Sequence, residues 1–128
     1  MTYLDTSVAL AQLLAEDRVP PAELWEESLV ASRLLEYEMW TRIQGRGLAR
    51  SHGELTRQLL ARVALLELSP SVLARAVERF PMPVRTLDAL HLASIEFLHK
   101  RGLTVQLASY DGRLIESARS LGIQIREL

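Results

Sequence analysis

Three of the four aspartates in the chain occupy positions from which a carboxylate could do chemistry. Asp5 directly follows the short apolar segment Thr2–Leu4, and Asp111 comes soon after the apolar segment Thr104–Ala108. In an open parallel α/β sheet, ligands bind outside the carboxyl ends of the strands. Asp88 lies in the first turn of a predicted helix, where an aspartate also suits the helix dipole. Taken singly, each aspartate is explained at least as well by helix capping.

Glu38 is harder to explain as a surface residue. The segment from Arg33 to about Gly47 has helical spacing, and at about 100° per residue Glu38 falls between Leu34 and Leu35 on its apolar face. An acid on such a face is costly to bury without a partner. We therefore expect Glu38 to open into a cleft and meet a cation. The alternative is an ion pair with Arg42, four residues further along the same helix.

Several carboxylates at one edge of a sheet would repel each other unless a cation lay between them. Mg²⁺ and Mn²⁺ are hard ions that prefer oxygen ligands. Sites of this kind activate water and stabilise charge on a phosphodiester, so the protein needs no nucleophile of its own. The chain has no cysteine, which excludes a disulfide scaffold, an iron–sulfur cluster, a cysteine zinc site and a cysteine nucleophile.

The composition is that of a globular domain. The chain has 128 residues, 48% of them hydrophobic and 24% charged, and we expect a single domain over residues 1–128. A net charge of −1 argues against nucleic-acid binding by bulk charge alone, although it allows a local basic patch. No apolar run reaches the roughly 18 residues of a membrane span, and Asp5 interrupts the first one too early for a signal peptide. We therefore expect a cytoplasmic protein.

The acids must be positioned by an alternation of short apolar strands and longer helices. The predicted strands are Thr2–Leu4, Leu29–Ala31, Leu65–Leu68, Thr104–Ala108 and Ile123–Arg126. The predicted helices are Thr6–Ala15, Ala22–Glu27, Arg33 to about Gly47, Ser51–Ala64, Pro70–Phe80, Thr86–Arg101 and Asp111–Leu121. Ser51 and Thr86 are the expected caps of their helices. This pattern predicts an α/β fold whose parallel sheet of four to five short strands is covered by helices on both faces.

The motifs that carry these acids resemble a known family. Asp5-Thr6-Ser7, after an N-terminal strand, is similar to the opening motif of PIN-domain ribonucleases, particularly the VapC-type toxins of prokaryotic toxin–antitoxin pairs. Ser32–Glu38 resembles their second motif and Thr86–Ala93 their third. Ser109–Leu114, followed by Gly122-Ile123, resembles the last motif, with serine where the family commonly has threonine. The resemblance covers nearly the whole chain in the right order.

The resemblance implies a metal-dependent endoribonuclease with a twisted parallel sheet between two layers of helices. Asp5, Glu38 and Asp88 would bind Mg²⁺ or Mn²⁺ directly or through water, and Asp111 would complete the negatively charged pocket. Ser7 and Ser109 would orient these carboxylates. Water held by the metal would attack the RNA phosphodiester. The resemblance also implies a cognate VapB-type antitoxin as a protein partner, and a homodimer.

One stretch of the chain is clearly basic. The segment Thr41–Arg62 has a single acid, Glu54, against five arginines, which are Arg42, Arg46, Arg50, Arg57 and Arg62. These side chains could lead an RNA backbone toward the acidic pocket, with Arg42 nearest to it. A solvated helical face explains the same pattern equally well.

The remaining candidates have structural interpretations. His91 shares the apolar stripe of its helix, so we expect a packed helix residue rather than a general base. Trp25, Tyr37 and Trp40 surround the early helices, where we expect core or dimer packing. A groove for a helix of a partner is the alternative for these three aromatics.

Three other functional classes share part of this pattern. A phosphohydrolase of the haloacid dehalogenase type needs a second Asp two residues after the first, where this chain has Ser7. A receiver domain needs a Lys after a late strand, whereas Lys100 ends a predicted helix. A PIN-like module that binds RNA or protein without cleaving remains the alternative to a nuclease, although a complete set of acids argues against it.

Overall fold

A four-stranded, fully parallel sheet forms the centre of the molecule, with the strands in the order β3-β2-β1-β4. The computed structural model describes all 128 residues. Its elements are β1 (Thr2–Leu4), α1 (Thr6–Leu14), η1 (Ala22–Glu26, a 3₁₀ helix), β2 (Leu29–Ser32), α2 (Arg33–Gly45), α3 (Ala49–Leu60), β3 (Val63–Leu66), α4 (Pro70–Ala76), α5 (Thr86–Lys100), β4 (Gln106–Ala108) and α6 (Gly112–Ser120). None of the helices is long and apolar enough to cross a membrane.

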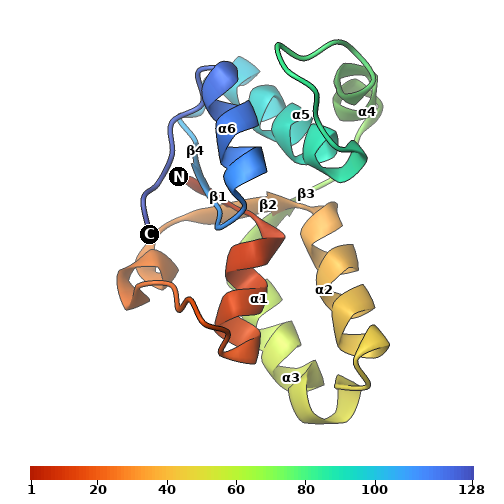
Figure 1. Ribbon diagram of the computed structural model, residues 1–128, viewed down its shortest axis with the longest axis vertical. Coiled ribbons are helices and arrows are strands. Elements are labelled where there is room, and N and C mark those ends of the chain that lie inside the picture. The colour runs from red at the N-terminus through yellow and green to blue at the C-terminus, as the bar shows by residue number, and fades with distance from the viewer.

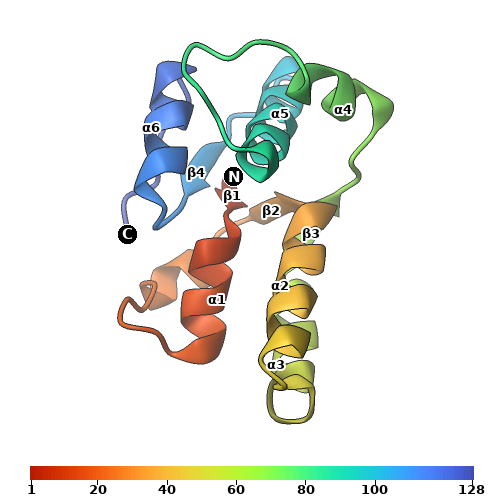
Figure 2. The same cartoon turned by 45° about the vertical axis from the view of Figure 1, so that its right-hand side comes forward.

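The helices form one layer on each face of the sheet. Helices α1, α2 and α3 lie on one side, and α4, α5 and α6 lie on the other (Figures 1 and 2). Successive strand residues face opposite layers. Leu4 and Ala31 therefore belong to the core beneath α1–α3, while Tyr3 and Val30 belong to the core beneath α5 and α6. This arrangement confirms the predicted three-layer α/β fold with a parallel sheet.

The parallel register brings the carboxyl ends of three strands together. Tyr3 pairs with Val30 on one side and with Leu107 on the other, so β2, β1 and β4 end at the same edge of the sheet. Asp5 and Ser109 follow β1 and β4 directly at that edge. The residues singled out by the sequence motifs are therefore positioned by strand pairing.

Two predicted strands were placed wrongly. The third strand begins at Val63 rather than Leu65, because α3 already ends at Leu60 and Val63 then pairs with Leu29 of β2. The expected last strand, Ile123–Arg126, is reduced to one bridge between Leu107 and Ile125, flanked by two backbone hydrogen bonds to β4.

The two predicted caps were also wrong. Helix α3 begins at Ala49 and is preceded by Leu48, whose side chain makes no capping hydrogen bond. Gly47, with a φ of 66°, lets the chain reverse so tightly that the helix starts before Ser51. Helix α5 begins at Thr86, but Arg85 occupies the cap position and also makes no side-chain capping bond.

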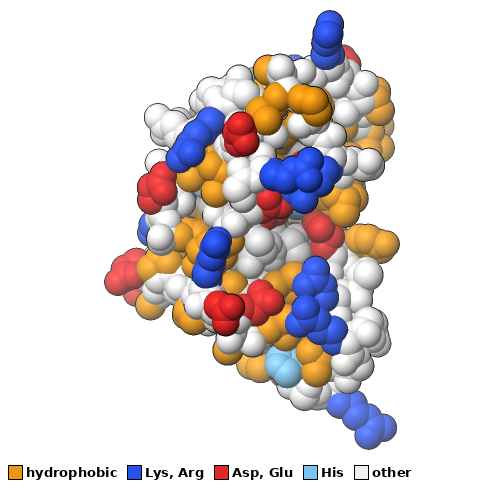
Figure 3. Space-filling view, in the orientation of Figure 1, with side chains coloured by type: hydrophobic (Ala, Val, Ile, Leu, Met, Phe, Trp, Pro, Cys, Tyr) orange, Lys and Arg blue, Asp and Glu red, His pale blue; other side chains and the backbone are white.

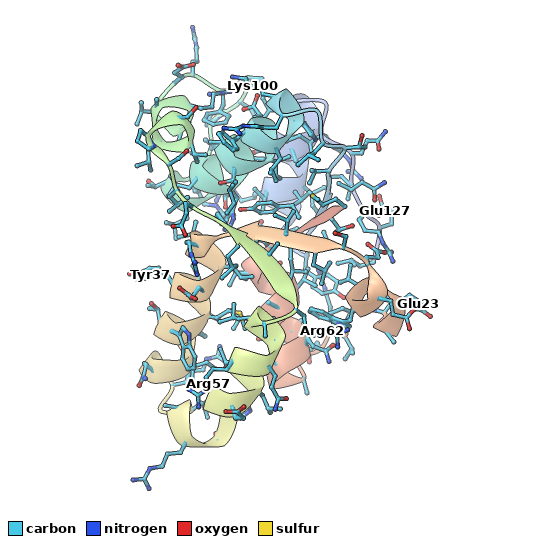
Figure 4. All side chains as sticks on the ribbon, turned by 180° about the vertical axis from the view of Figure 1, so that it is seen from behind. Glu23, Tyr37, Arg57, Arg62, Lys100 and Glu127 are labelled. Atoms are coloured by element: carbon cyan, nitrogen blue, oxygen red, sulfur yellow. The ribbon has the colours of Figure 1, made fainter.

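The early aromatic residues divide into two groups. Trp25 and Trp40 pack against the core beneath α1–α3, as expected. Tyr37, by contrast, is 64% exposed and points outward from α2 (Figure 4). Tyr37 therefore does not pack in the core, and the expectation that it packs in a dimer stays a prediction.

Candidate active site

A pocket of about 740 Å³ opens at the carboxyl end of the sheet. The four predicted acids all line it, although each comes from a different part of the chain. Asp5 lies between β1 and α1, Glu38 on α2, Asp88 in the first turn of α5, and Asp111 at the start of α6. Figure 3 shows acidic side chains near the middle of this face, with basic side chains above and below them. The structure thus brings all four acids to one place.

Two serine hydroxyls fix the carboxylate of Asp5, which is 6% exposed. The Oγ atoms of Ser7 and Ser109 donate to its Oδ2 at 2.6 and 2.8 Å. Each hydroxyl oxygen in turn accepts a backbone N–H from the segment after β4, that of Tyr110 for Ser7 (3.0 Å) and that of Asp111 for Ser109 (2.9 Å). The two serines therefore hold Asp5 in one orientation and tie it to the loop that carries Asp111.

Asp5 and Asp111 each cap a helix and also line the pocket. Asp5 caps α1 through a 3.4 Å bond from the Ser7 backbone N–H. Asp111 caps α6, because its Oδ1 accepts the N–H groups of Arg113 and Leu114. The N-terminal turns of α1 and α6 thus stabilise two carboxylates that also face the pocket.

One carboxylate oxygen of Glu38 is fixed by hydrogen bonds, and the other accepts none from the protein. Its Oε1 accepts hydrogen bonds from the Thr6 hydroxyl at 2.8 Å and from His91 Nε2 at 2.9 Å, while Oε2 accepts none from the protein. Burial raises the pKa of Glu38, but His91, Thr6 and the charge of Arg42 outweigh it, so that the net pKa is lowered. The alternative ion pair with Arg42 does not form, because the partner of Glu38 is His91.

The polar role of His91 was missed at the level of sequence. The ring is packed at 2% exposure, as expected, but it also bonds Tyr3 Oη through Nδ1 at 2.8 Å and lies 3.8 Å from Asp5 Oδ1. Burial lowers the pKa of His91, but Tyr3, Glu38 and Asp5 together raise it to about 10. The available signal was its position one helical turn beyond Asp88, on the same face of α5.

Arg85 was also missed. Its Nε donates to Asp88 Oδ2 at 2.8 Å, and its terminal amino group pairs with Asp111 Oδ2, so one guanidinium bridges two acids. Burial, with the nearby charges of Asp111 and Asp5, raises the pKa of Asp88 despite Arg85. Burial also raises the pKa of Asp111, but the bond from Arg85 and two backbone N–H groups lower it overall.

The donor chemistry of the pocket suits a hard divalent cation. Asp5, Glu38 and Asp88 each keep one carboxylate oxygen that accepts no hydrogen bond from the protein, whereas both oxygens of Asp111 are engaged. The acids do not converge far enough for three of them to hold one ion in this arrangement. Asp88 and Asp111 already hold one cation between them, the guanidinium of Arg85.

The basic stretch divides into residues that serve the fold and residues that face solvent. Arg57 pairs with Glu54 and lies over the Trp40 ring, and Arg62 donates to a backbone carbonyl. Arg42, Arg46 and Arg50 are exposed and form no ion pair. Only Arg42 lines the pocket, while Arg46 and Arg50 lie further along, where α2 turns into α3.

The protein is a three-layer α/β domain that brings acids from both helical layers together at the carboxyl end of a parallel sheet. The chain belongs to the PIN domain family, whose model matches residues 2–121.

Two relatives from Mycobacterium tuberculosis match along nearly the whole chain. One, named Ribonuclease VapC47 (strain CDC 1551 / Oshkosh), is 31% identical over an alignment of 129 positions that covers 95% of this chain and 93% of the relative. The other, named Ribonuclease VapC46 (strain ATCC 25618 / H37Rv), is 33% identical over an alignment of 130 positions that covers 96% of this chain and 94% of the relative. Among solved structures, a toxin–antitoxin complex from Klebsiella pneumoniae matches with a TM-score of 0.64 at 15% identity, covering 94% of each chain. That last likeness supports the fold.

Proposed function

We propose that this protein is a metal-dependent endoribonuclease and the toxin component of a type II toxin–antitoxin pair. The observation that carries the proposal is the convergence of Asp5, Glu38, Asp88 and Asp111 in one pocket, with three carboxylate oxygens left free of protein hydrogen bonds. The names of the two mycobacterial relatives support the same activity.

Asp5, Glu38 and Asp88 would hold Mg²⁺ or Mn²⁺ directly or through bridging water, and Asp111 would complete the charge of the pocket. Once bound, such an ion lowers the pKa of a water molecule and stabilises the charge that develops on the phosphodiester. The donor set consists of oxygen atoms alone, which these ions prefer.

The protein's own residues would orient the reactants. Ser7 and Ser109 hold Asp5 through its Oδ2, so that Oδ1 stays directed away from the serines. Thr6 and His91 hold Glu38 through Oε1 in the same way. Arg42 at the pocket wall offers a positive charge to the RNA phosphate, which the acids alone would repel.

The decisive experiment is an RNA cleavage assay on purified protein free of any antitoxin, with Mg²⁺, Mn²⁺ and chelator arms. Asp88→Asn is purified in parallel. We expect cleavage that requires the metal and disappears in the variant, because the amide is a poorer ligand and carries no charge. Equal cleavage by both proteins would reveal a contaminant. The absence of cleavage by either on a broad RNA pool would favour the alternative, a PIN-like module that binds RNA or protein without cutting.

We further propose that Arg42, Arg46 and Arg50 bind the RNA backbone. Arg46→Glu and Arg50→Glu are expected to weaken RNA binding and to flatten its salt dependence, by about 0.7 in the slope of log K against log salt for each phosphate that is no longer neutralised. Arg119→Glu is the matched control, since Arg119 is 61% exposed at the far end of α6. A salt slope unchanged in the first two variants, measured by fluorescence anisotropy, would rule out this RNA path.

We also propose a cognate VapB-type antitoxin as protein partner and a homodimer as the assembly. The relatives' VapC names and the matched toxin–antitoxin complex support the partner. Light scattering of the isolated protein at micromolar concentration tests the homodimer, which a monomeric mass would refute.

A further inference from the structure

A buried polar pair lies directly beneath the acids. Tyr3 is fully buried and His91 is 2% exposed, and their rings meet edge to face with centroids 5.7 Å apart. Tyr3 stands two residues before Asp5 on β1, and His91 stands one helical turn after Asp88 on α5. Alternation along the strand and the helical repeat therefore point both side chains toward the floor of the pocket.

We propose that Tyr3 and His91 act as positioning residues that fix the rotamer of Glu38, so that its Oε2 faces the divalent ion. This inference rests on the proposed function and deepens it. The contacts run without a gap, from the Ser32 backbone N–H to Tyr3 Oη (3.2 Å), from Tyr3 Oη to His91 Nδ1 (2.8 Å), and from His91 Nε2 to Glu38 Oε1 (2.9 Å).

The hydrogen bonds give each member of this network a defined role. Tyr3 Oη accepts the N–H of Ser32, which leaves its own O–H free to donate to His91 Nδ1. A neutral imidazole that accepts at Nδ1 carries its proton on Nε2, and Nε2 is the atom that faces Glu38. The bond to Tyr3 Oη thus fixes the orientation of the His91 ring, with Nε2 turned toward the carboxylate. In the doubly protonated ring Nε2 also donates, so the contact with Glu38 persists in both charge states.

This network does more than fill the core. His91 Nε2 satisfies its own hydrogen bond and at the same time holds Oε1 of Glu38, the carboxylate oxygen opposite to the free Oε2. Thr6 donates to the same Oε1 from α1, so one donor from each helical layer restrains Glu38. Groups that orient metal ligands in this way typically contribute about 10–100-fold to metal affinity or activity.

Two substitutions of His91 separate positioning from packing. In His91→Gln the side-chain amide nitrogen can occupy the place of Nε2 and donate to Glu38, whereas in His91→Asn the shorter amide does not reach it. We expect His91→Asn to weaken Mn²⁺ binding by about tenfold or more, and His91→Gln to recover most of that affinity. Mn²⁺ dissociation constants, measured by calorimetry on proteins with matched near-UV circular dichroism, give the comparison without an activity assay.

Tyr3→Phe distinguishes a positioning role of the Tyr3 hydroxyl from a role of the Tyr3 ring in packing. The variant keeps the ring and removes the hydroxyl, so it should weaken Mn²⁺ binding by about three- to tenfold where His91 is present. It should cause little further loss in the His91→Gln background, because the contact between Tyr3 Oη and the imidazole Nδ1 is already absent there. The two substitutions are therefore expected to be non-additive in Mn²⁺ affinity. Thermal unfolding reports separately on any stability lost with the bond to Ser32.

His99→Asn serves as the control, since His99 also lies on α5 but bonds the backbone carbonyl of Val105. Its Mn²⁺ affinity should match that of the unchanged protein. Equal affinities for the Asn and Gln variants of His91, or additive losses with Tyr3→Phe, would overturn the positioning role while leaving the proposed nuclease intact. A failure of the unchanged protein to bind Mn²⁺ at all would overturn both proposals.

Discussion

With Asn in place of Asp5, RNA cleavage is expected to fall by at least about 100-fold, more than the loss of an outer partner of a metal ligand usually costs. Asp5 is the acid held most firmly, because Ser7 and Ser109 both donate to its Oδ2. An amide oxygen at the same place still accepts those hydroxyl groups, so the fold should survive. The variant removes only the negative charge and one ligand atom. Metal-dependent cleavage and Mn²⁺ affinity, measured side by side, should fall together.

Asp17→Asn is the matched control for this experiment. Asp17 lies at the rim of the same pocket, in the exposed segment after α1, and makes no hydrogen bond through its side chain. Its cleavage rate should remain close to that of the unchanged protein. If Asp5→Asn cut RNA as fast as this control, the pocket would not be the nuclease site.

Replacing Arg85 with Gln should have the opposite effect on the metal and lower the Mn²⁺ dissociation constant by about tenfold. The guanidinium bridges Asp88 and Asp111, so a divalent ion that uses Asp88 has to displace part of this bridge. Two partly exposed ion pairs, at about 0.5–1 kcal/mol each, together correspond to about a 5- to 30-fold change in affinity. Without the ion, the variant should unfold at a lower temperature, because the two acids lose their counter-charge.

Arg113→Gln provides the comparison for Arg85, since Arg113 lies near it on α6 but forms no ion pair. Arg85→Lys keeps the charge but loses the two-pronged contact, and its affinity should fall between those of the unchanged protein and Arg85→Gln. Mn²⁺ affinity that was unchanged or weaker in Arg85→Gln would show that Arg85 assists the metal rather than competing with it.

The acids could be predicted because their signals are local. Asp5 and Asp111 follow strands, and parallel strands end at one edge of the sheet. Glu38 stood out because an acid on an apolar helical face needs a partner. Each of these inferences uses a few neighbouring residues and a general rule of the fold.

The groups that neutralise and orient the acids could not be predicted in the same way. His91 lies 53 residues from Glu38 and 88 residues from Tyr3, so no local spacing connects the three. Arg85 reaches Asp111 across 26 residues of chain. Spacing along a single helix offers only Arg42 as a cation for Glu38, whereas the packing of α5 against β1 and β2 supplies His91.

The errors in the fold come from competition between neighbouring segments. The apolar run after α3 supports a strand beginning at Val63 or at Leu65, and only the register against Leu29 decides between them. The end of the chain has strand-like residues, but only Ile125 forms a bridge to β4. Tertiary pairing determines such boundaries, and the sequence alone leaves them open.

The pocket takes its acids from both sides of the sheet, so its geometry depends on the packing of both helical layers. Glu38 belongs to the layer of α1–α3 and Asp88 to the opposite layer, so a loosening of either core separates them even if every helix stays formed. Any ligand that contacts both acids binds the native packing and not the expanded state, and its binding free energy adds to the stability of the fold. Occupancy of the site and cohesion of the two layers are therefore a single linked equilibrium.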